Sequence, residues 1–561
     1  MHWLDWSIIA LYFFFIAGIT LWAGRQNNST EDYFLAGRHA GFFLIGASIF
    51  SSNIGSEHIV GLAGSGASTG LAMAHWELHA WVLVILAYIF VPFYYKSGVY
   101  TMPEYLERRF GPTSRWILSI VSLTAYVLTK VSVTIYAGAL VFESLLPTTF
   151  GTPENAFWVG AFSTVILTGI YTVIGGMRAV IYTEAPQAVL LIIGSCIITF
   201  IGLHHLGGWG ELVAMASERK EELALWRPLD DPDLPWLAVL IASPIIGIWY
   251  WCTDQYIVQR TLTGRNLKEA RRGALFGGLL KVTPVLIFLI PGLIGWALHQ
   301  KGIISIETVM GADGSEVIVG DKIFPTMVSE LLPIGLRGLI IACMLAALMS
   351  SLASLFNSCA TLFTVDIYEK LKPNQSQGHY VLVGRLATTV VVGLGILWIP
   401  IMRAISSGGL YDYLQGVQGY LAPPIAAVFL LGLFWKRINS AGAAWCLGLG
   451  FTLGMSKLAI ESIFGTAAGK VSNPAFLAAI GDFNKFYAAG VLFLISIFIL
   501  IAVSFMTKAP AAIKTDKLTY ASVSGDPEVK ESWDVGNTIL ATVVLLLVLG
   551  MYGYFTFWLS F

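Results

Sequence analysis

Charged residues are scarce in this sequence. They make up 12% of the 561 residues, whereas about 25% is usual in a soluble globular chain. The formal net charge of -1 argues against a nucleic-acid partner, for which a strong basic excess is expected. Hydrophobic residues reach 56%, with a mean hydropathy of +0.73. The composition therefore predicts a membrane protein whose surroundings are the lipid bilayer.

Motifs typical of enzymes and metal proteins are also missing. The five cysteines all fall within apolar runs, at spacings that suggest neither a disulfide framework nor a zinc site. The sequence has no ATP-binding motif, no metal-ligand cluster and no nucleophile motif in its usual context. The first apolar run follows no basic segment, so we expect a retained span and not a cleaved signal peptide. We therefore expect no enzyme activity and predict no protein partner.

Long apolar runs dominate the sequence instead. A helix needs about 20 mostly apolar residues to cross the hydrocarbon core of a membrane, and the sequence contains fourteen such runs. They are 4–24, 41–72, 76–97, 117–147, 155–178, 185–206, 236–263, 274–300, 325–366, 380–405, 408–434, 440–464, 482–506 and 534–559. We expect turns inside the two longest, 41–72 and 325–366. The predicted fold class is an all-α polytopic membrane protein of about fourteen helices.

The basic residues predict the orientation. If both termini are extracytoplasmic, most of the 33 Lys and Arg residues fall in cytoplasmic loops, as the positive-inside rule requires. Glycosylation sequons at Asn27, Asn28 and Asn374 would then lie inside, which favours a bacterial inner membrane over a eukaryotic cell surface. Residues 507–533 are polar, and we interpret them as a cytoplasmic tether to the last span.

One apolar run contains an unexpected polar segment, "SSNIGSEH", with Asn53, Glu57 and His58 around Gly55. Backbone groups freed by a helix break at membrane depth are tolerated only where they line a cavity or bind something. Many secondary transporters build their substrate and ion sites from such discontinuous helices. Ser, Asn and Gly can also serve close helix packing. The ionisable pair favours a site, because charges inside a membrane are costly and usually functional.

Single charges interrupt two other spans, at Glu77 and Lys281. Each alone could be a snorkelling side chain near the membrane surface. Together they would offer an acceptor and a donor, which suits a neutral hydroxylated ligand such as a sugar.

A second weakened helix is predicted at "GGLYDYLQGVQGYLAPP", which contains Asp412 and Gln415. Aromatic residues accompany the polar positions of both segments, and for any one of them packing or the interfacial belt is the simpler reading. These aromatic residues are Trp76, Tyr250, Trp251 and Tyr411.

Hydroxyl groups gather in "ALMSSLASLFNSCAT", where Ser350, Ser351 and Ser354 lie within about one helical turn. Hydroxyl and carbonyl oxygens suit a small hard cation such as sodium. Serine can equally bond to carbonyls of its own helix, and the spacing alone does not decide between the two.

Six segments together resemble the sodium/glucose cotransporters of the solute:sodium symporter family. They are "STEDYFLAGR", "SSNIGSEHIVGLAGSG", "GVYTMPEYLERRFG", "WYWCTDQYIVQR", "MSSLASLFNSCATLFTVDIY" and "PPIAAVFLLGLFWKR". The resemblance runs from about residue 28 to 440. It implies a LeuT-type fold, in which two inverted five-helix repeats follow one extra helix and precede three more. The implied regions are 1–40 (first helix and cytoplasmic loop), 41–206 (first repeat), 207–235 (extracytoplasmic loop), 236–434 (second repeat) and 435–561 (three last helices).

The resemblance also implies roles for individual residues. Sugar-contacting positions correspond to Asn53, His58, Glu77, Tyr250, Trp251, Lys281 and Gln415. Outer-gate positions correspond to Leu62, Trp76 and Tyr411. Sodium ligands correspond to Ser51, Ile54, Ala347, Ser350 and Ser351, with Glu184 at an ion-exit or second-sodium position. The co-transported ion would be sodium, and the implied activity is import of a neutral, glucose- or galactose-like monosaccharide.

The sequence departs from the family pattern at a few positions. Glu184 stands where relatives usually carry Asp, and Ala353 replaces a hydroxyl typical of relatives that couple two sodium ions. We therefore expect one sodium per sugar. Ala80 and Gly247 replace polar residues that contact sugar in some relatives, which leaves myo-inositol or another polyol as an alternative substrate. Proton coupling through Glu57, His58 or Glu184 is a further alternative, as is a sugar sensor that binds without transport.

Overall fold

The computed structural model describes residues 2–25, 29–55, 57–310, 316–405, 410–466 and 469–560, without the side chains of 128, 401–405 and 410–413. Asn27, Asn28 and the side chains of Tyr411 and Asp412 therefore lie outside the described part of the chain. The described residues are almost entirely helical, as predicted for an all-α membrane protein.

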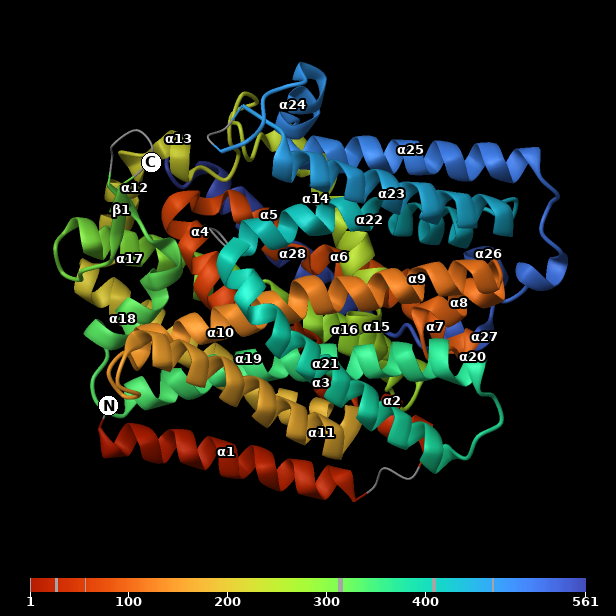
Figure 1. The fold of residues 1–561 in the computed structure, drawn as a ribbon, viewed down its shortest axis with the longest axis horizontal. Coiled ribbons are helices and arrows are strands. Elements are labelled where there is room, and N and C mark those ends of the chain that lie inside the picture. Colours follow the sequence, from red (N-terminus) through yellow and green to blue (C-terminus); the bar gives the residue numbers. More distant parts are fainter. Residues whose placement is uncertain are drawn as a thin grey trace.

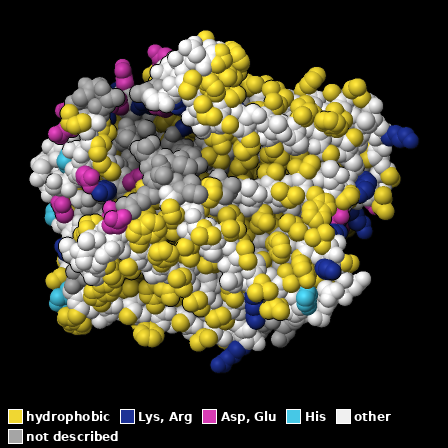
Figure 2. All heavy atoms as spheres, in the orientation of Figure 1, with side chains coloured by type: hydrophobic (Ala, Val, Ile, Leu, Met, Phe, Trp, Pro, Cys, Tyr) yellow, Lys and Arg dark blue, Asp and Glu magenta, His cyan; other side chains and the backbone are white. Residues whose placement is uncertain are grey.

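The helices lie side by side along the long axis of the molecule, with the N- and C-termini at the same end (Figure 1). Apolar side chains cover much of the flank between the two ends (Figure 2). Lys and Arg side chains gather at the end that carries helices α26 and α27, and Asp and Glu side chains at the other (Figure 2). This distribution is typical of a bundle whose flank faces lipid and whose ends face water.

The helices of the first part of the chain are α1 (Trp3–Gly24), α2 (Thr30–Leu35), α3 (Phe42–Asn53), α4 (Ala63–Ser68), α5 (Ala74–Glu77), α6 (Ala80–Ile85), α7 (Val91–Ser97), α8 (Met102–Arg109), α9 (Pro112–Ala125), α10 (Ser132–Leu145) and α11 (Pro153–Leu206). The middle part forms α12 (Trp209–Ser217), α13 (Lys220–Leu223), α14 (Trp236–Gly247), α15 (Gln255–Leu262), α16 (Leu267–Lys281), α17 (Ile290–Gln300), α18 (Ile323–Leu331), α19 (Leu336–Thr361), α20 (Glu369–Leu371) and α21 (Gln377–Ile405). The last part forms α22 (Leu410–Phe434), α23 (Ser440–Ile463), α24 (Ala475–Asp482), α25 (Lys485–Met506), α26 (Tyr520–Val523), α27 (Pro527–Glu531) and α28 (Val535–Phe557).

Shorter elements complete the fold. Strands β1 (Thr308–Met310) and β2 (Glu316–Ile318) pair antiparallel, with Thr308 opposite Ile318. π-Helical segments extend or join several helices. They are Glu57–Leu62, Leu86–Phe90, Tyr126–Val131, Ile248–Thr253, Val285–Leu289 and Leu362–Tyr368.

Twelve helices of the described chain are long and apolar enough to cross a membrane, where the sequence predicts fourteen. They are Trp3–Gly24, Gly70–Ser97, Pro112–Leu145, Pro153–Leu206, Trp236–Thr253, Leu267–Gln300, Leu336–Leu371, Gln377–Pro400, Leu414–Phe434, Ser440–Ile463, Lys485–Met506 and Val535–Phe557. The difference has two physical causes. Helix α11 covers both 155–178 and 185–206 and bends at Gly176 instead of ending there. The run 41–72 is divided into pieces that are each too short to count.

Two helices are broken in the interior of the bundle. Helix α3 ends at Asn53, and Ile54 is extended (φ -84°, ψ 99°) before the π-helical segment that leads into α4. The predicted span 236–263 is also interrupted, at Asp254 (φ -81°, ψ 128°), which was not expected. The Asp254 carboxylate accepts a hydrogen bond from the backbone N–H of Tyr256 (3.2 Å) and so caps α15. Each break leaves main-chain groups available at the centre of the molecule.

The bend in α11 depends on Gly176, whose backbone (φ 55°, ψ -156°) lies in a region that only glycine adopts readily. A Cβ at this position would lie 2.7 Å from the carbonyl oxygen of Tyr33. We expect Gly176→Ala to lower the free energy of unfolding by about 2 kcal/mol, seen as a lower thermal unfolding midpoint in detergent. Gly393→Ala is the matched control, because a Cβ at Gly393 meets nothing within 4 Å and alanine favours the helix. Equal midpoints for the two variants would contradict this account of the bend.

The tether between α25 and α28 folds back onto the bundle. Lys96 of α7 forms an ion pair with Asp526 (3.1 Å), and Tyr105 Oη donates to the carbonyl oxygen of Leu518 (3.2 Å). On the other side, Lys268 and Arg272 of α16 each lie 2.8 Å from Asp534. The Lys268 hydrogen bond and the N–H of Asn537 hold the pKa of the Asp534 carboxyl well below its usual range. The tether is therefore attached to α7 and to α16, two helices that also contact each other.

Candidate functional site

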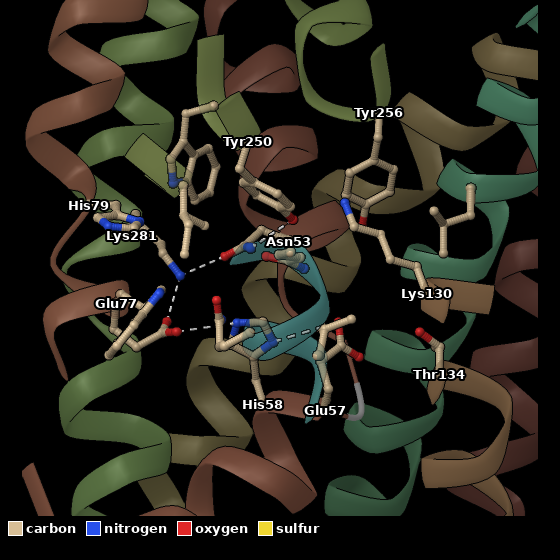
Figure 3. Close-up of a pocket in the computed structure, with 17 residues that line it drawn as sticks. Asn53, Glu57, His58, Glu77, His79, Lys130, Thr134, Tyr250, Tyr256 and Lys281 are labelled. Carbon is tan, nitrogen blue, oxygen red and sulfur yellow. Dashed lines mark hydrogen bonds and ion pairs between the residues drawn. The ribbon is translucent and has the colours of Figure 1, made fainter. Parts of the chain in front are cut away.

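A cavity lies between the two helix breaks, lined by side chains from both of them and from the helices alongside (Figure 3). Its lining residues are Asn53, Glu57, His58, Trp76, Glu77, His79, Lys130, Thr134, Ile246, Tyr250, Trp251, Tyr256, Lys281, Leu355, Leu414, Gln415 and Gln418. All seven residues predicted to contact substrate are among them. The cavity volume is about 40 Å³, room for only a water or two, so a larger ligand requires the lining side chains to move apart.

An ion pair and an amide form the polar centre of this cavity. Lys281 Nζ lies 2.5 Å from Glu77 Oε2 and donates to Asn53 Oδ1 at 2.8 Å. Asn53 Nδ2 in turn donates to Tyr250 Oη at 3.0 Å. Lys281 and Glu77 are both buried, where neither charge is tolerated without a partner. The chain of alternating donors and acceptors matches what a hydroxylated ligand offers on each of its hydroxyl groups.

His58 extends the network toward the break at Ile54, where α3 ends. Its Nε2 lies 3.5 Å from Glu77 Oε1. Its Nδ1 accepts a hydrogen bond from the N–H of Gly55 at 3.4 Å. His58 thus lies between the Glu77 carboxylate and the backbone at Gly55.

Three of the aromatic residues predicted at the site, Trp76, Tyr250 and Trp251, line the cavity. Tyr250 and Trp251 meet edge to face, with ring centroids 4.9 Å apart, and the Trp251 ring lies 5.5 Å from Lys281 Nζ. Of the predicted outer gate, Trp76 lines the cavity and Leu62 is buried without lining it. The third gate residue, Tyr411, is the one whose side chain is outside the described part.

Gln415 reaches the cavity from an unbroken helix, which corrects a prediction. Helix α22 runs without interruption from Leu410 to Phe434, so its polar residues do not mark a second weakened helix. The second break is at Asp254 instead. Gln415 is buried, and its Oε1 has no hydrogen-bond partner among the described residues. Its amide is thus a further polar group facing the cavity.

The predicted sodium ligands of α19 lie beside the end of α3. Ser350 Oγ lies 2.8 Å from the carbonyl oxygen of Ser51 and 2.9 Å from that of Ala347. Ser351 Oγ donates to the carbonyl oxygen of Ser52 at 3.0 Å. These residues are buried, and the Ser51 hydroxyl has no hydrogen-bond partner in the described structure. Carbonyl and hydroxyl oxygens in a water-free place are the donor set that a sodium ion requires.

No group of three or more His, Cys, Asp or Glu side chains that could hold a metal ion occurs in the described ranges. The predicted sodium ligands instead offer carbonyl and hydroxyl oxygens, a donor set that suits a hard cation better than a transition metal.

Glu184 lies directly beside these serines. Its carboxylate accepts hydrogen bonds from Ser52 Oγ (2.9 Å) and from the hydroxyls of Ser48 and Ser354. Arg260 Nη2 is 3.7 Å from Glu184 Oε1, and both side chains are fully buried. Glu184 is thus hydrogen-bonded to Ser52, the neighbour of the predicted sodium ligand Ser51, and its charge is balanced by Arg260.

A further buried ion pair was missed by reasoning from the sequence. Lys130 Nζ lies 3.1 Å from Asp254 Oδ2, and the same ammonium is 4.2 Å from the centroid of the Tyr250 ring. The signal was present, because Lys130 is a charge in the middle of the apolar run 117–147, as Lys281 is a charge inside its own run. Asp254 and Arg260 lie in "WYWCTDQYIVQR", whose aromatic residues alone were interpreted.

Comparison with known proteins places this site in a family context. A model of the sodium:solute symporter family matches residues 33–450. "Sodium/glucose cotransporter 1" of Oryctolagus cuniculus is 38% identical over 95% of this chain and 83% of its own length. "Sodium/myo-inositol cotransporter 2" of Mus musculus is 37% identical over 92% of this chain and 79% of its own length.

A solved structure shows the same fold. A sodium-coupled sialic acid symporter, in a substrate-bound outward-open state, superposes with a TM-score of 0.73. The two proteins are 22% identical, and the match covers 90% of this chain and 98% of that one. The helical arrangement is therefore shared.

Proposed function

The chain belongs to the sodium:solute symporter family, and from this premise we propose that it imports a neutral monosaccharide together with sodium by alternating access. As a member of this family it is a multi-pass membrane transporter and not an enzyme. The observation that carries the choice of substrate is the convergence of Asn53, Glu77, Lys281 and Gln415 on one buried cavity with Trp251 beside them. This combination offers hydrogen-bonding groups for hydroxyls and an aromatic face for a sugar ring.

Sodium is the proposed coupling ion, held between the carbonyl oxygens of Ser51 and Ile54 and the oxygens of Ala347, Ser350 and Ser351. The contacts of Ser350 with Ser51 and of Ser351 with Ser52 support this site. The proposed ion ligands Ser51 and Ile54 lie on either side of Asn53 in the chain, and Asn53 lines the substrate cavity. Binding of either ligand thus orders the backbone that the other one needs, which is a physical route to coupling.

We propose that the helices around the cavity belong to two inverted five-helix repeats, residues 41–206 and residues 236–434. Each contains one broken helix, at Ile54 and at Asp254. Broken helices at corresponding places in two repeats are typical of secondary transporters. The proposal also includes about fourteen membrane-spanning helices, the number predicted from the sequence.

We further propose one sodium per sugar, since Ala353 gives the serine run no additional hydroxyl. One inward charge contributes about 2.3 kcal/mol per 100 mV of membrane potential, which supports a concentration ratio of some tens. Parallel measurement of sodium and sugar fluxes is expected to give a ratio near one. A ratio near two would contradict the proposal.

We propose that both termini are extracytoplasmic and that the tether lies in the cytoplasm. The gathering of Lys and Arg at the tether end of the bundle (Figure 2) supports it, because cytoplasmic ends of membrane proteins are enriched in these residues. The membrane itself is proposed to be a bacterial inner membrane.

Sodium-dependent accumulation is the expected result of the first test. Proteoliposomes containing the protein should concentrate labelled glucose or galactose under an inward sodium gradient, and not under an equal choline gradient. Accumulation in choline under a pH gradient would favour proton coupling instead, with Glu57, His58 or Glu184 as the carrier of the proton.

A polyol such as myo-inositol is the second candidate substrate. It is favoured by the relative named as a sodium/myo-inositol cotransporter, and its ring of hydroxyls would use the same donors and acceptors. Competition by unlabelled glucose, galactose and myo-inositol against one labelled substrate separates the candidates. Binding without accumulation of any of them would indicate a sensor.

A further inference from the structure

Glu57 is a cavity-lining carboxylate to which neither the family comparison nor the proposed sugar contacts give a role. It is buried, with 7% of its surface exposed, and its Oε2 has no hydrogen-bond partner among the described residues. The carboxylate lies over Gly55, where an added Cβ would overlap Oε2. The glycine at the helix break thus leaves the space that this carboxylate occupies.

The two lysines of the cavity already have carboxylate partners. Lys281 is paired with Glu77 at 2.5 Å and Lys130 with Asp254 at 3.1 Å. Lys130 Nζ also lies over the rings of Tyr250 and Tyr256, 4.2 and 4.5 Å from their centroids. Glu57 is therefore a third carboxylate beside two cations that are each engaged elsewhere.

His58 lies next to Glu57. Its Nδ1 lies 3.9 Å from Glu57 Oε1, beyond hydrogen-bond length, and the same Nδ1 accepts a hydrogen bond from the N–H of Gly55. The cavity lining contains two carboxylates, Glu57 and Glu77, and two lysines, and both lysines are paired with carboxylates other than Glu57.

A buried carboxylate without a cation is costly, and a ligand that brings a positive charge removes that cost. A charge-assisted hydrogen bond from an ammonium group to Glu57 Oε2 would be stronger than one from a hydroxyl. The remaining polar groups of the cavity, Asn53 and Gln415 among them, suit hydroxyls. The complementary ligand is therefore a small polyhydroxylated molecule that carries one protonated amine.

We propose that Glu57 forms an ammonium subsite in the substrate cavity, so that the transporter takes amino sugars in preference to the corresponding neutral sugars. This inference rests on the proposed sugar site and names the substrate class within it. The amine would occupy the side of the cavity nearest the break at Ile54, beside Glu57 and His58.

The test compares D-glucosamine with D-glucose, which differ only in the amine at one carbon. Calorimetric titration of the purified protein in sodium buffer at pH 6.5 keeps the amine charged, because a primary amine next to a polar carbon has a pKa of about 7.7–8.0. We expect glucosamine to bind at least ten-fold more tightly than glucose. In Glu57→Gln the two affinities should become equal within about two-fold.

Controls separate the subsite from general effects of substitution. Glu221→Gln, on the exposed helix α13, should keep the ten-fold preference. Glu57→Gln removes a buried charge without a cation and should keep or raise the thermal unfolding midpoint, so an altered preference would not reflect misfolding. A preference retained in Glu57→Gln would overturn the proposal.

The outcomes also distinguish this inference from the proposed function. Equal binding of both sugars by the unchanged protein contradicts the subsite and leaves neutral-sugar transport standing. Binding of glucosamine without glucose supports the subsite and contradicts transport of neutral sugars. If only myo-inositol binds, the same comparison is made with its amino-deoxy analogue, and equal affinities again overturn the subsite. Failure of all four ligands to bind overturns both proposals.

Discussion

Lys281→Ala is expected to reduce sodium-driven sugar uptake at least a hundred-fold. The Lys281 ammonium lies 2.5 Å from Glu77 and donates to Asn53 at 2.8 Å, in a place closed to water. Its removal leaves the Glu77 carboxylate buried without a lysine beside it, which costs about 3–5 kcal/mol. It also removes the donor that orients Asn53. Since 1.4 kcal/mol is a factor of ten, even part of this loss reduces uptake by two orders of magnitude.

Initial uptake rates per amount of folded protein in proteoliposomes measure this effect. Lys530→Ala, on the exposed surface of the tether, is the control for loss of a lysine and should transport normally. A second variant, Glu77→Gln combined with Lys281→Met, replaces both charges with neutral groups of similar size. It should recover the unfolding midpoint of the unchanged protein but not its uptake. Uptake by Lys281→Ala above a tenth of the normal rate would contradict a substrate-binding role.

Ser351→Ala is expected to raise the half-saturating sodium concentration by ten- to a hundred-fold. Ser351 Oγ reaches the broken helix at the carbonyl oxygen of Ser52 (3.0 Å), in the cluster proposed to hold the ion. A hydrogen bond or oxygen contact with a charged group contributes about 1.5–3 kcal/mol, which corresponds to this change in affinity. Sugar affinity at saturating sodium should change less than two-fold, because the hydroxyl does not line the sugar cavity.

Sodium titration of sugar uptake measures the change directly. Ser358→Ala is the matched control. Ser358 is two turns further along α19. Its Oγ donates a hydrogen bond to Gln259 Oε1 at 3.2 Å, away from the break at Ile54. An unaltered sodium dependence in Ser351→Ala would remove this serine from the ion site. Equal effects in both variants would indicate a general weakening of α19.

The positions of the helices could be predicted well from the sequence. Apolar length identifies a membrane span without knowledge of its neighbours. Most observed spans match one predicted run apart from shifts at their ends, whereas Pro153–Leu206 joins two of them. The break at Ile54 was also visible, because glycine and polar residues within an apolar run are a local signal. The convergence of the seven predicted residues on one cavity came from the family resemblance, since no local pattern relates Asn53 to Lys281 across 228 residues.

Other features depend on contacts that no local pattern encodes. Lys130 and Asp254 are 124 residues apart, so their pairing follows only from the packing of two helices. The break at Asp254 coincides with the capping of α15 by the Asp254 carboxylate, an effect of one side chain that the predicted span 236–263 did not take into account. Conversely, α22 stays continuous despite its glycines, and it packs along α23 and α25.

The tether makes ion pairs with two helices that belong to different proposed repeats. Lys96 of α7 contacts it at Asp526, and Lys268 and Arg272 of α16 contact it at Asp534. Helix α7 lies in the proposed first repeat and α16 in the proposed second, and the two helices also pack against each other. The ion pairs therefore add a second attachment between the proposed repeats at this end of the molecule. Because the paired groups are near the surface, added salt is expected to weaken that attachment.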